Sequence, residues 1–249
     1  MARHSKWANI KHRKSATDAK KGKVFTKMAK LITVAAQSGG DMETNALLRA
    51  AVEKAKASNL PAVNIERAIK KGTGELKGEM RLVEITYEGY GPGGVAIMAK
   101  CLTENTNRSF ANLRNIMTKN DGVWGSSGCV SWMFERKGII EACLIIENRD
   151  DFELQLIDTG AETIEWDGDF VRLTCPPDSF EQCLKVFNKG VVQKSEVELV
   201  PKEEKIINEL SSARAISSLI DLIEEDDDVV DVVTNAGYSE GVLDALGNG

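Results

Sequence analysis

The sequence predicts an α+β protein: an N-terminal three-helix module plus two α/β domains, one ferredoxin-like (βαββαβ) and inserted into the other. Three observations predict this fold. Apolar residues recur at helical spacing up to about residue 72, they alternate at a period of two from residue 82, and helical spacing returns near the C-terminus. A chain of 249 residues has room for two or three small domains. We predict a basic arm and helical module over 1–78, a discontinuous α/β domain over 79–135 plus 205–249, and the inserted domain over 136–204.

The N-terminal module is expected to contain three short helices. The first runs from Lys20, has an apolar face that includes Phe25 and Ile32, and ends at Gly39-Gly40. The second carries apolar residues over 47–55, and the third starts near Pro61, a residue suited to a first helical turn. Residues 72–78 are rich in glycine and are expected to link this module to the rest of the chain.

The second domain is expected to begin with the order ββαβ. Its elements are predicted as strands over 82–87 and 94–103, a helix around 110–117 and a strand over 129–134. That last strand would place Val130, Trp132 and Phe134 on one face, as core or as a platform for stacking RNA bases, and core is the interpretation we favour. A helix over 211–225 and a strand over 229–234 cannot bury themselves alone, so we expect them to complete this sheet.

The inserted domain is expected to have the order βαββαβ. Its elements are predicted as strand 139–146, helix 150–158, strands 161–166 and 170–174, helix 179–187 and strand 196–200.

The charge is distributed unevenly along the chain. The net charge is −6, yet residues 1–77 hold 17 Lys/Arg against 6 Asp/Glu, and residues 78–249 hold 15 against 32. Such asymmetry indicates a basic binding module attached to an acidic body. The five cysteines have no CxxC spacing, which favours reduced thiols over a disulfide framework. We expect a cytoplasmic protein without a membrane span or a secretory signal.

The first candidate site is a basic arm, defined as residues 3–14. It combines five Lys/Arg, both histidines of the chain and a tryptophan, with no acidic residue. Cations neutralise phosphates, and Trp7 can stack on a base. The alternative is a solvated tail that Trp7 anchors to the body. The candidate nucleic-acid contacts are Arg3, His4, Lys6, Trp7, Lys11, His12, Arg13 and Lys14.

The second candidate site is a lysine stripe on the first helix. Lys20, Lys23, Lys27 and Lys30 recur at helical spacing beside the apolar face. The stripe continues the basic arm, so we include it in the candidate nucleic-acid interface, although such a stripe is often only a solvated face. The acidic run over 224–228 is expected to be a solvated turn, with mimicry of a phosphate chain or contact with the basic module of a neighbouring molecule as alternatives.

No catalytic residue, metal site, cofactor or small-molecule substrate is predicted. His4 and His12 lack nearby metal ligands and a nucleophile, and the Gly89–Gly94 stretch lacks the GK[ST] of a P-loop. Asn105 to Ser109 stand just before a helix, where we expect them to act as caps rather than as an anion site.

Several long segments resemble the YebC/PmpR family, which includes mitochondrial translational activators of cytochrome oxidase synthesis. They are residues 4–14, 22–25, 64–72, 87–94 and 128–130. One departure is Arg3, where the family usually has a glycine. The resemblance implies three domains, a cytoplasmic location and no enzymatic activity. It also implies a DNA-binding transcriptional regulator or, alternatively, a ribosome-associated, rRNA-binding translation factor that relieves stalling.

Overall fold

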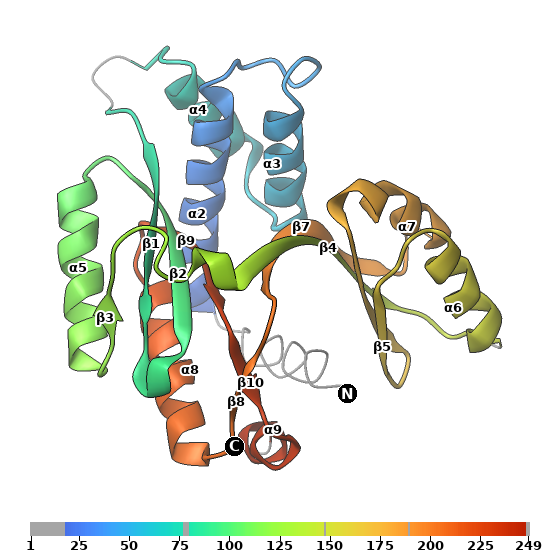
Figure 1. Ribbon diagram of the computed structural model, residues 1–249. Coiled ribbons are helices and arrows are strands. Elements are labelled where there is room, and N and C mark those ends of the chain that lie inside the picture. The colour runs from blue at the N-terminus through green and yellow to red at the C-terminus, as the bar shows by residue number, and fades with distance from the viewer. Residues whose placement is uncertain (1–17, 77–79, 147, 189, 248–249) are drawn as a thin grey trace. The chain divides into compact units, whose positions relative to one another are not determined.

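A computed structural model describes residues 18–76, 80–146, 148–188 and 190–247, with the side chains of 18–21 and 247 left out. The predicted α+β class and the N-terminal helical module are both confirmed (Figure 1). The described residues fall into two compact units. One lies within Ser15–Ser131 and Arg214–Val233, and the other within Trp132–Ala213 and Thr234–Gly249.

The helical module consists of α2 (Asp18–Ala36), α3 (Ala46–Ala57) and α4 (Ala62–Gly72). α3 begins where the Asn45 side chain accepts a hydrogen bond from the backbone N–H of Leu48, and Pro61 precedes α4 as predicted. α2 packs against both other helices. The three helices share a core of their own, built from Ile32, Ala36, Leu48, Val52, Ala55, Leu60, Ile65 and Ala68.

α2 and α4 approach each other closely at Gly72. A Cβ built on Gly72 would lie 2.2 Å from the carbonyl oxygen of Thr33 and 2.6 Å from Cβ of Ala36. The Thr33 hydroxyl donates to the carbonyl of Ala29, 2.8 Å away, and also lies 3.2 Å from the carbonyl of Ala68 on α4. The glycine therefore allows the helix contact that forms one wall of the site described below.

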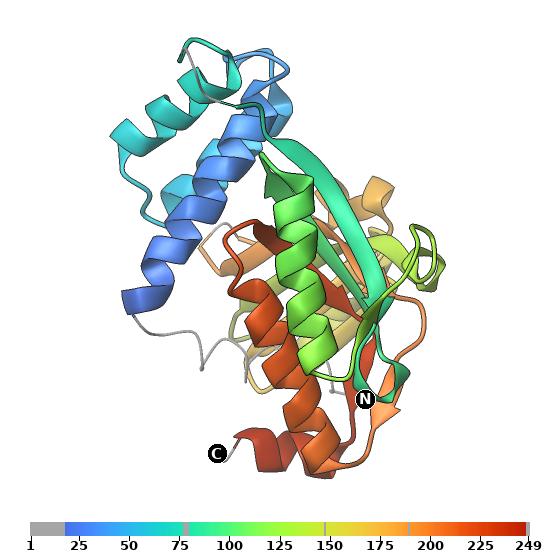
Figure 2. The ribbon, with the colours of Figure 1, turned by 90° about the vertical axis from the view of Figure 1, so that its left-hand side faces the viewer.

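The same compact unit contains a four-stranded sheet in the order β3-β1-β2-β9. Its elements are β1 (Val83–Tyr90), a 3-10 turn (Pro92–Gly94), β2 (Ala96–Thr103), α5 (Thr106–Lys119), β3 (Val123–Trp124), α8 (Leu210–Glu224) and β9 (Val229–Thr234). β9 pairs beside β2, so the C-terminal strand joins this sheet as expected. α5 and α8 lie side by side over one face of β1 and β2 (Figure 2).

The prediction of a strand over 129–134 is wrong. Residues Ser131–Met133 form a 3-10 turn, and the next strand starts only at Phe134. The backbone N–H groups of Val130 and Ser131 donate to the Glu88 carboxylate, so they are not available for strand pairing. Val130 and Phe134 are buried, as core residues would be, whereas Trp132 is 64% exposed.

The second unit contains the ferredoxin-like sheet, in the order β5-β6-β4-β7. Its elements are β4 (Phe134–Cys143), α6 (Arg149–Asp158), β5 (Thr163–Asp167), β6 (Phe170–Cys175), a 3-10 turn (Pro177–Ser179), α7 (Phe180–Val186) and β7 (Val192–Pro201). This is the predicted βαββαβ order, and each neighbouring pair of strands is antiparallel. Alternate residues of β4 and β6, including Ile140 and Leu173, build a core with Leu156 of α6.

Several short elements were not predicted, and β3 is one of them. β8 (Lys205–Ile207) and β10 (Ala236–Tyr238) form a two-stranded parallel sheet, and α9 (Glu240–Gly247) follows. Strands of three residues are too short to give a period in the sequence. The domain boundaries near residues 78, 135 and 204 stay a prediction.

Candidate nucleic-acid interface

The basic arm lies outside the described residues. Its eight candidate contacts, from Arg3 to Lys14, therefore stay predictions, as does Lys20, whose side chain is also not described. The structure does describe the other three lysines of the stripe on α2.

These three lysines contact the acidic run over 224–228. Nζ of Lys27 donates to the carbonyl of Glu224 at 2.7 Å, Lys23 to the carbonyl of Glu225 at 3.1 Å, and Lys30 to the carbonyl of Asp227 at 2.8 Å. Glu224 is the last residue of α8, and Glu225 and Asp227 lie in the turn that follows it. Carbonyls at the C-terminal end of a helix lack intrahelical donors and carry partial negative charge. The acidic run thus contacts the basic module of its own chain and is more than a solvated turn.

Asp228 is the centre of a buried polar cluster. Its carboxylate accepts from Nζ of Lys30 at 2.6 Å, from Nη2 of Arg108 at 2.8 Å and from the hydroxyl of Ser109 at 2.7 Å. Thr103 adds a fourth donor at 3.1 Å. Burial by itself would raise the pKa of Asp228, but the donors from Lys30, Arg108 and Ser109 outweigh it and hold that pKa well below its ordinary value.

The predicted caps at the start of α5 belong to this cluster. The Asn105 side chain accepts from the backbone N–H of Arg108 at 3.0 Å, which is the capping role expected for it. The Ser109 hydroxyl lies 2.8 Å from that of Thr103. The first turn of α5 is therefore fixed relative to Asp228, and with it the position of the Arg108 guanidinium.

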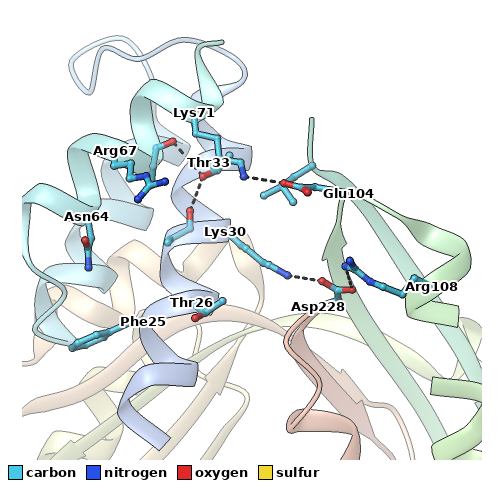
Figure 3. Close-up of a pocket in the computed structure, with 13 residues that line it drawn as sticks. Phe25, Thr26, Lys30, Thr33, Asn64, Arg67, Lys71, Glu104, Arg108 and Asp228 are labelled. Atoms are coloured by element: carbon cyan, nitrogen blue, oxygen red, sulfur yellow. Dashed lines mark hydrogen bonds and ion pairs between the residues drawn. The ribbon is translucent and has the colours of Figure 1, made fainter. Parts of the chain in front are cut away.

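A cleft of about 460 Å³ opens beside this cluster, between α2, α4 and the start of α5 (Figure 3). We call it the α2–α4 cleft. Lys30 and Thr33 line it from α2, and Lys71 from α4 forms an ion pair with Glu104 across it at 2.8 Å. Its charged lining residues are Lys30, Arg67, Lys71, Glu104, Arg108 and Asp228, and Phe25 and Asn64 lie at the end of the cleft away from Glu104.

These lining residues give the cleft an excess of positive charge. Four cations and two carboxylates give this set a net charge of +2. A cleft of this volume and positive charge can bind an anion larger than a small inorganic ion.

A second buried carboxylate holds the loop over 125–131. Glu88 on β1 accepts backbone hydrogen bonds from Gly128 at 2.9 Å, Val130 at 3.0 Å and Ser131 at 2.8 Å. Burial would raise the pKa of Glu88, but these three donors lower it overall. Gly128 has φ of 88°, a left-handed conformation that suits glycine. Two segments of the family resemblance, 87–94 and 128–130, therefore meet at this carboxylate.

Burial keeps three of the five cysteines in the thiol form. All five are free, and burial raises the pKa values of Cys101 and Cys175 to about 12. Burial also raises the pKa of Cys129, with a further contribution from nearby Glu88. These three thiols stay protonated near neutral pH, the unreactive form. Among the residues that the structure describes, no three His, Cys, Asp or Glu residues are placed to hold a metal ion, and no helix is long and apolar enough to span a membrane.

Sequence reasoning missed the cleft residues on α4 and at the ends of the strands. Asn64, Arg67 and Lys71 recur at i, i+3 and i+7, which places them on one side of α4, and they lie in the segment 64–72 that carries the family resemblance. That spacing was the available signal. Asp228 could not be assigned, because its partners Lys30 and Arg108 are 198 and 120 residues away in the sequence.

Comparisons with known proteins match both the N-terminal part and the remainder of the chain to the same family. The family model described as "TACO1/YebC protein N-terminal domain" matches residues 5–75, and that described as "TACO1/YebC second and third domain" matches residues 82–236. Two relatives are each named "Probable transcriptional regulatory protein". The one from Natranaerobius thermophilus is 46% identical, covering 98% of this chain and 99% of the relative. The one from Halothermothrix orenii is 41% identical and covers 99% of each chain.

A solved structure is also similar. It is the crystal structure of a conserved hypothetical protein from Aquifex aeolicus, with a TM-score of 0.77 and 38% sequence identity. The match covers 90% of this chain and 93% of that chain. The likeness therefore extends over most of both folds.

Proposed function

The chain belongs to the TACO1/YebC family, and from this premise we propose that it is a non-enzymatic regulator of gene expression that binds nucleic acid through its basic N-terminal module. The target that we propose is DNA, and the process is the regulation of transcription. The relatives' name, probable transcriptional regulatory protein, supports this choice. The proposed location is the cytoplasm, with no membrane partner, no cofactor and no small-molecule substrate.

The observation that carries the proposal is the positive surface charge of the N-terminal helical module, which has a hydrophobic core of its own. Residues 18–76 hold 11 Lys/Arg against 6 Asp/Glu. Apolar side chains from all three helices form the module's core, and exposed cations remain on α3 and α4, among them Lys54, Lys56 and Lys70. The arm adds five more cations and no acid. Such a density of positive charge favours phosphate backbones through counterion release.

A second candidate function is a ribosome-binding translation factor that contacts ribosomal RNA and relieves stalling. The strongly acidic composition of residues 78–249 favours it, because a long DNA duplex would be repelled unless only the basic module approached it. An arm with Trp7 among cations also suits a folded RNA, where stacking and shape dominate recognition. Under this alternative, the ferredoxin-like domain would serve as a docking surface.

Charge reversal in the arm tests nucleic-acid binding. The variant carries Lys11→Glu, Arg13→Glu and Lys14→Glu, and affinity for a DNA duplex and for ribosomal RNA is measured across a salt series. We expect a large loss of affinity and a shallower salt dependence. For each phosphate that the arm no longer neutralises, the slope should fall by about 0.9 on a duplex and by about 0.7 on a single strand.

A matched control reverses three exposed cations of the acidic body, Arg114, Lys119 and Lys185, and changes the net charge by the same amount. It should bind almost as the unchanged protein does. If the arm variant keeps both affinity and salt slope, the arm is not the interface.

Crosslinking in cells, followed by sequencing of the attached DNA and RNA, separates the two targets. Enrichment of promoter DNA supports transcriptional regulation. Enrichment of ribosomal RNA replaces it with the translation-factor alternative.

A further inference from the structure

We propose that the α2–α4 cleft binds a phosphate group carried by a nucleotide, at a site separate from the basic arm. The preference for an anion comes from the cleft itself, whereas the choice of a nucleotide as its carrier rests on the proposed function. The phosphate can belong to a free nucleotide or to a nucleic-acid chain, and both present the same chemistry.

The charges of the cleft favour a dianion. The two carboxylates are already paired within the cleft, Glu104 with Lys71 and Asp228 with Lys30 and Arg108. With Arg67 included, the charged lining residues carry a net charge of +2, which a bound phosphate would meet. A phosphate monoester carries close to that charge at neutral pH.

The donors are of the types that recognise phosphate. Arg67 and Lys71 reach into the cleft from α4, and Arg108 approaches from α5 (Figure 3). A guanidinium offers a planar fork of N–H donors that matches phosphate oxygens, and an ammonium adds a compact charge. Arg108 contacts Asp228 through Nη2 and has five N–H donors in all, so the ion pair orients the group without using its whole donor set.

The donors are also held in place before a ligand arrives. Lys71 is fixed by Glu104, and Asp228 orients both Lys30 and Arg108. A preorganised site loses less side-chain entropy when it binds.

The size and remaining lining of the cleft point to more than inorganic phosphate. About 460 Å³ is within the range of small-molecule sites and exceeds a single phosphate ion. Phe25 and Asn64 lie at the end of the cleft opposite Glu104. A phenyl ring can stack on a base, and a side-chain amide can pair with a base edge. The phosphate is therefore expected among Arg67, Lys71 and Arg108, with the nucleoside toward Phe25.

The test is a nuclear magnetic resonance titration of the full chain, isotopically labelled, with adenosine monophosphate, inorganic phosphate and acetate as probes. We expect saturable shifts of the Asn64 side-chain amide and of the backbone amides of Arg67 and Lys71. Adenosine monophosphate should bind more tightly than inorganic phosphate, and acetate most weakly. Absence of saturable shifts at these residues, or equal binding of acetate and phosphate, would overturn the proposal.

The decisive variant is Arg67→Ala, compared with Arg49→Ala, which removes the same exposed side chain from α3 outside the cleft. Arg67→Ala should weaken binding of adenosine monophosphate by about tenfold or more, the usual cost of losing a charge-assisted hydrogen bond. Arg49→Ala should leave the affinity unchanged. Equal affinities for Arg67→Ala and the unchanged protein refute the site. Because the probe titration uses the unchanged protein, it tests the site even if Arg67→Ala folds poorly.

Oligonucleotides with and without a 5′-phosphate identify the source of the phosphate. If the source is a chain end, the phosphorylated oligonucleotide should bind more tightly, and Arg67→Ala should remove the difference. If it is a free nucleotide, both oligonucleotides should bind alike while adenosine monophosphate still occupies the cleft.

The proposed function and the proposed cleft site can be refuted independently of each other. The arm variant Lys11→Glu, Arg13→Glu and Lys14→Glu should still bind adenosine monophosphate. Nucleotide binding without any binding of DNA or RNA would refute the proposed function alone. Nucleic-acid binding with an empty cleft would refute this inference alone.

Discussion

Lys30 on α2 and Asp228 before β9 form an ion pair of 2.6 Å whose side chains are only 17% and 7% exposed. The other carboxylate oxygen of Asp228 accepts from Arg108 at the start of α5. One carboxylate thus links three elements that are far apart in the sequence, and it sets the positions of two cations in the α2–α4 cleft. Because the Asp228 carboxylate is buried and has two charged partners, it should contribute strongly to the stability of the fold.

The first prediction is that Asp228→Asn destabilises the protein. The amide cannot balance the charges of Lys30 and Arg108, and its NH₂ group would face a donor. We expect the free energy of unfolding in urea to fall by about 2–3 kcal/mol at pH 7. Asp227→Asn is the matched control, since Asp227 is exposed, and it should change stability by no more than about 0.5 kcal/mol.

The same residue gives a pH prediction. The folded protein lowers the pKa of Asp228 below its unfolded value of about 3.9, so its contribution is fully present above that pH. As the pH falls below about 4, toward the folded pKa, the contribution is lost. The stability difference between the unchanged protein and Asp228→Asn should therefore be constant above about pH 5 and shrink below about pH 4. A difference that grows on acidification would contradict this assignment.

The second prediction concerns Glu88 and the loop over 125–131. In Glu88→Gln the amide NH₂ cannot accept from a backbone N–H, so at least one of Gly128, Val130 and Ser131 loses its acceptor. We expect faster hydrogen exchange of these amides and a loss of about 1–3 kcal/mol in unfolding free energy. Glu84→Gln on the same strand is the control, because Glu84 is exposed and pairs with Lys100 at the surface. Equal exchange rates in both variants would show that the carboxylate does not hold the loop.

Local patterns predicted most of the fold. The three N-terminal helices, both long strands of the first sheet and the full βαββαβ order follow from apolar periodicity and turn residues. The prediction failed at 129–134, where alternation of apolar residues suggested a strand. Glu88, about 40 residues earlier in the chain, binds the backbone of this segment and so overrides the local pattern.

The candidate site could be predicted only in part. Net charge and spacing made the lysines of α2 candidates, which stay a prediction, and nothing in the sequence indicates that the acceptors of Lys23 and Lys27 lie about 200 residues away. Their partners are backbone carbonyls, which carry no sequence signature. The cleft could not be predicted from the sequence either, because Arg67 and Arg108 come together only through tertiary packing.

The third prediction concerns the close approach of α2 and α4. Gly72→Ala should force these helices apart, because its Cβ would meet the backbone of Thr33 at 2.2 Å, and we expect a loss of about 1–3 kcal/mol. Gly22→Ala is the matched change in α2, where a Cβ meets nothing within 4 Å. It should stabilise the protein by about 0.5–1 kcal/mol, because alanine favours helix. In thermal unfolding, a lower Tm for Gly72→Ala and a higher Tm for Gly22→Ala would establish the close contact between α2 and α4.

The fourth prediction separates structural lysines from those that bind nucleic acid. α8 has no basic residue in its last turn, and Lys27 supplies a cation there by donating to the carbonyl of Glu224 at 2.7 Å. Lys27→Met keeps the aliphatic stem and removes the charge, so we expect unfolding free energy to fall by about 1 kcal/mol. The control is Lys56→Met, an exposed lysine of α3, which should leave stability almost unchanged.

Nucleic-acid affinity should distinguish Lys27 from the arm. Because the Lys27 ammonium is engaged with α8, Lys27→Met should weaken binding far less than the charge reversal of Lys11, Arg13 and Lys14. If Lys27→Met instead leaves stability unchanged and lowers affinity by a large factor, the lysine contacts phosphate directly. The stripe would then extend the interface, and the acidic run over 224–228 would compete with nucleic acid for the same cations.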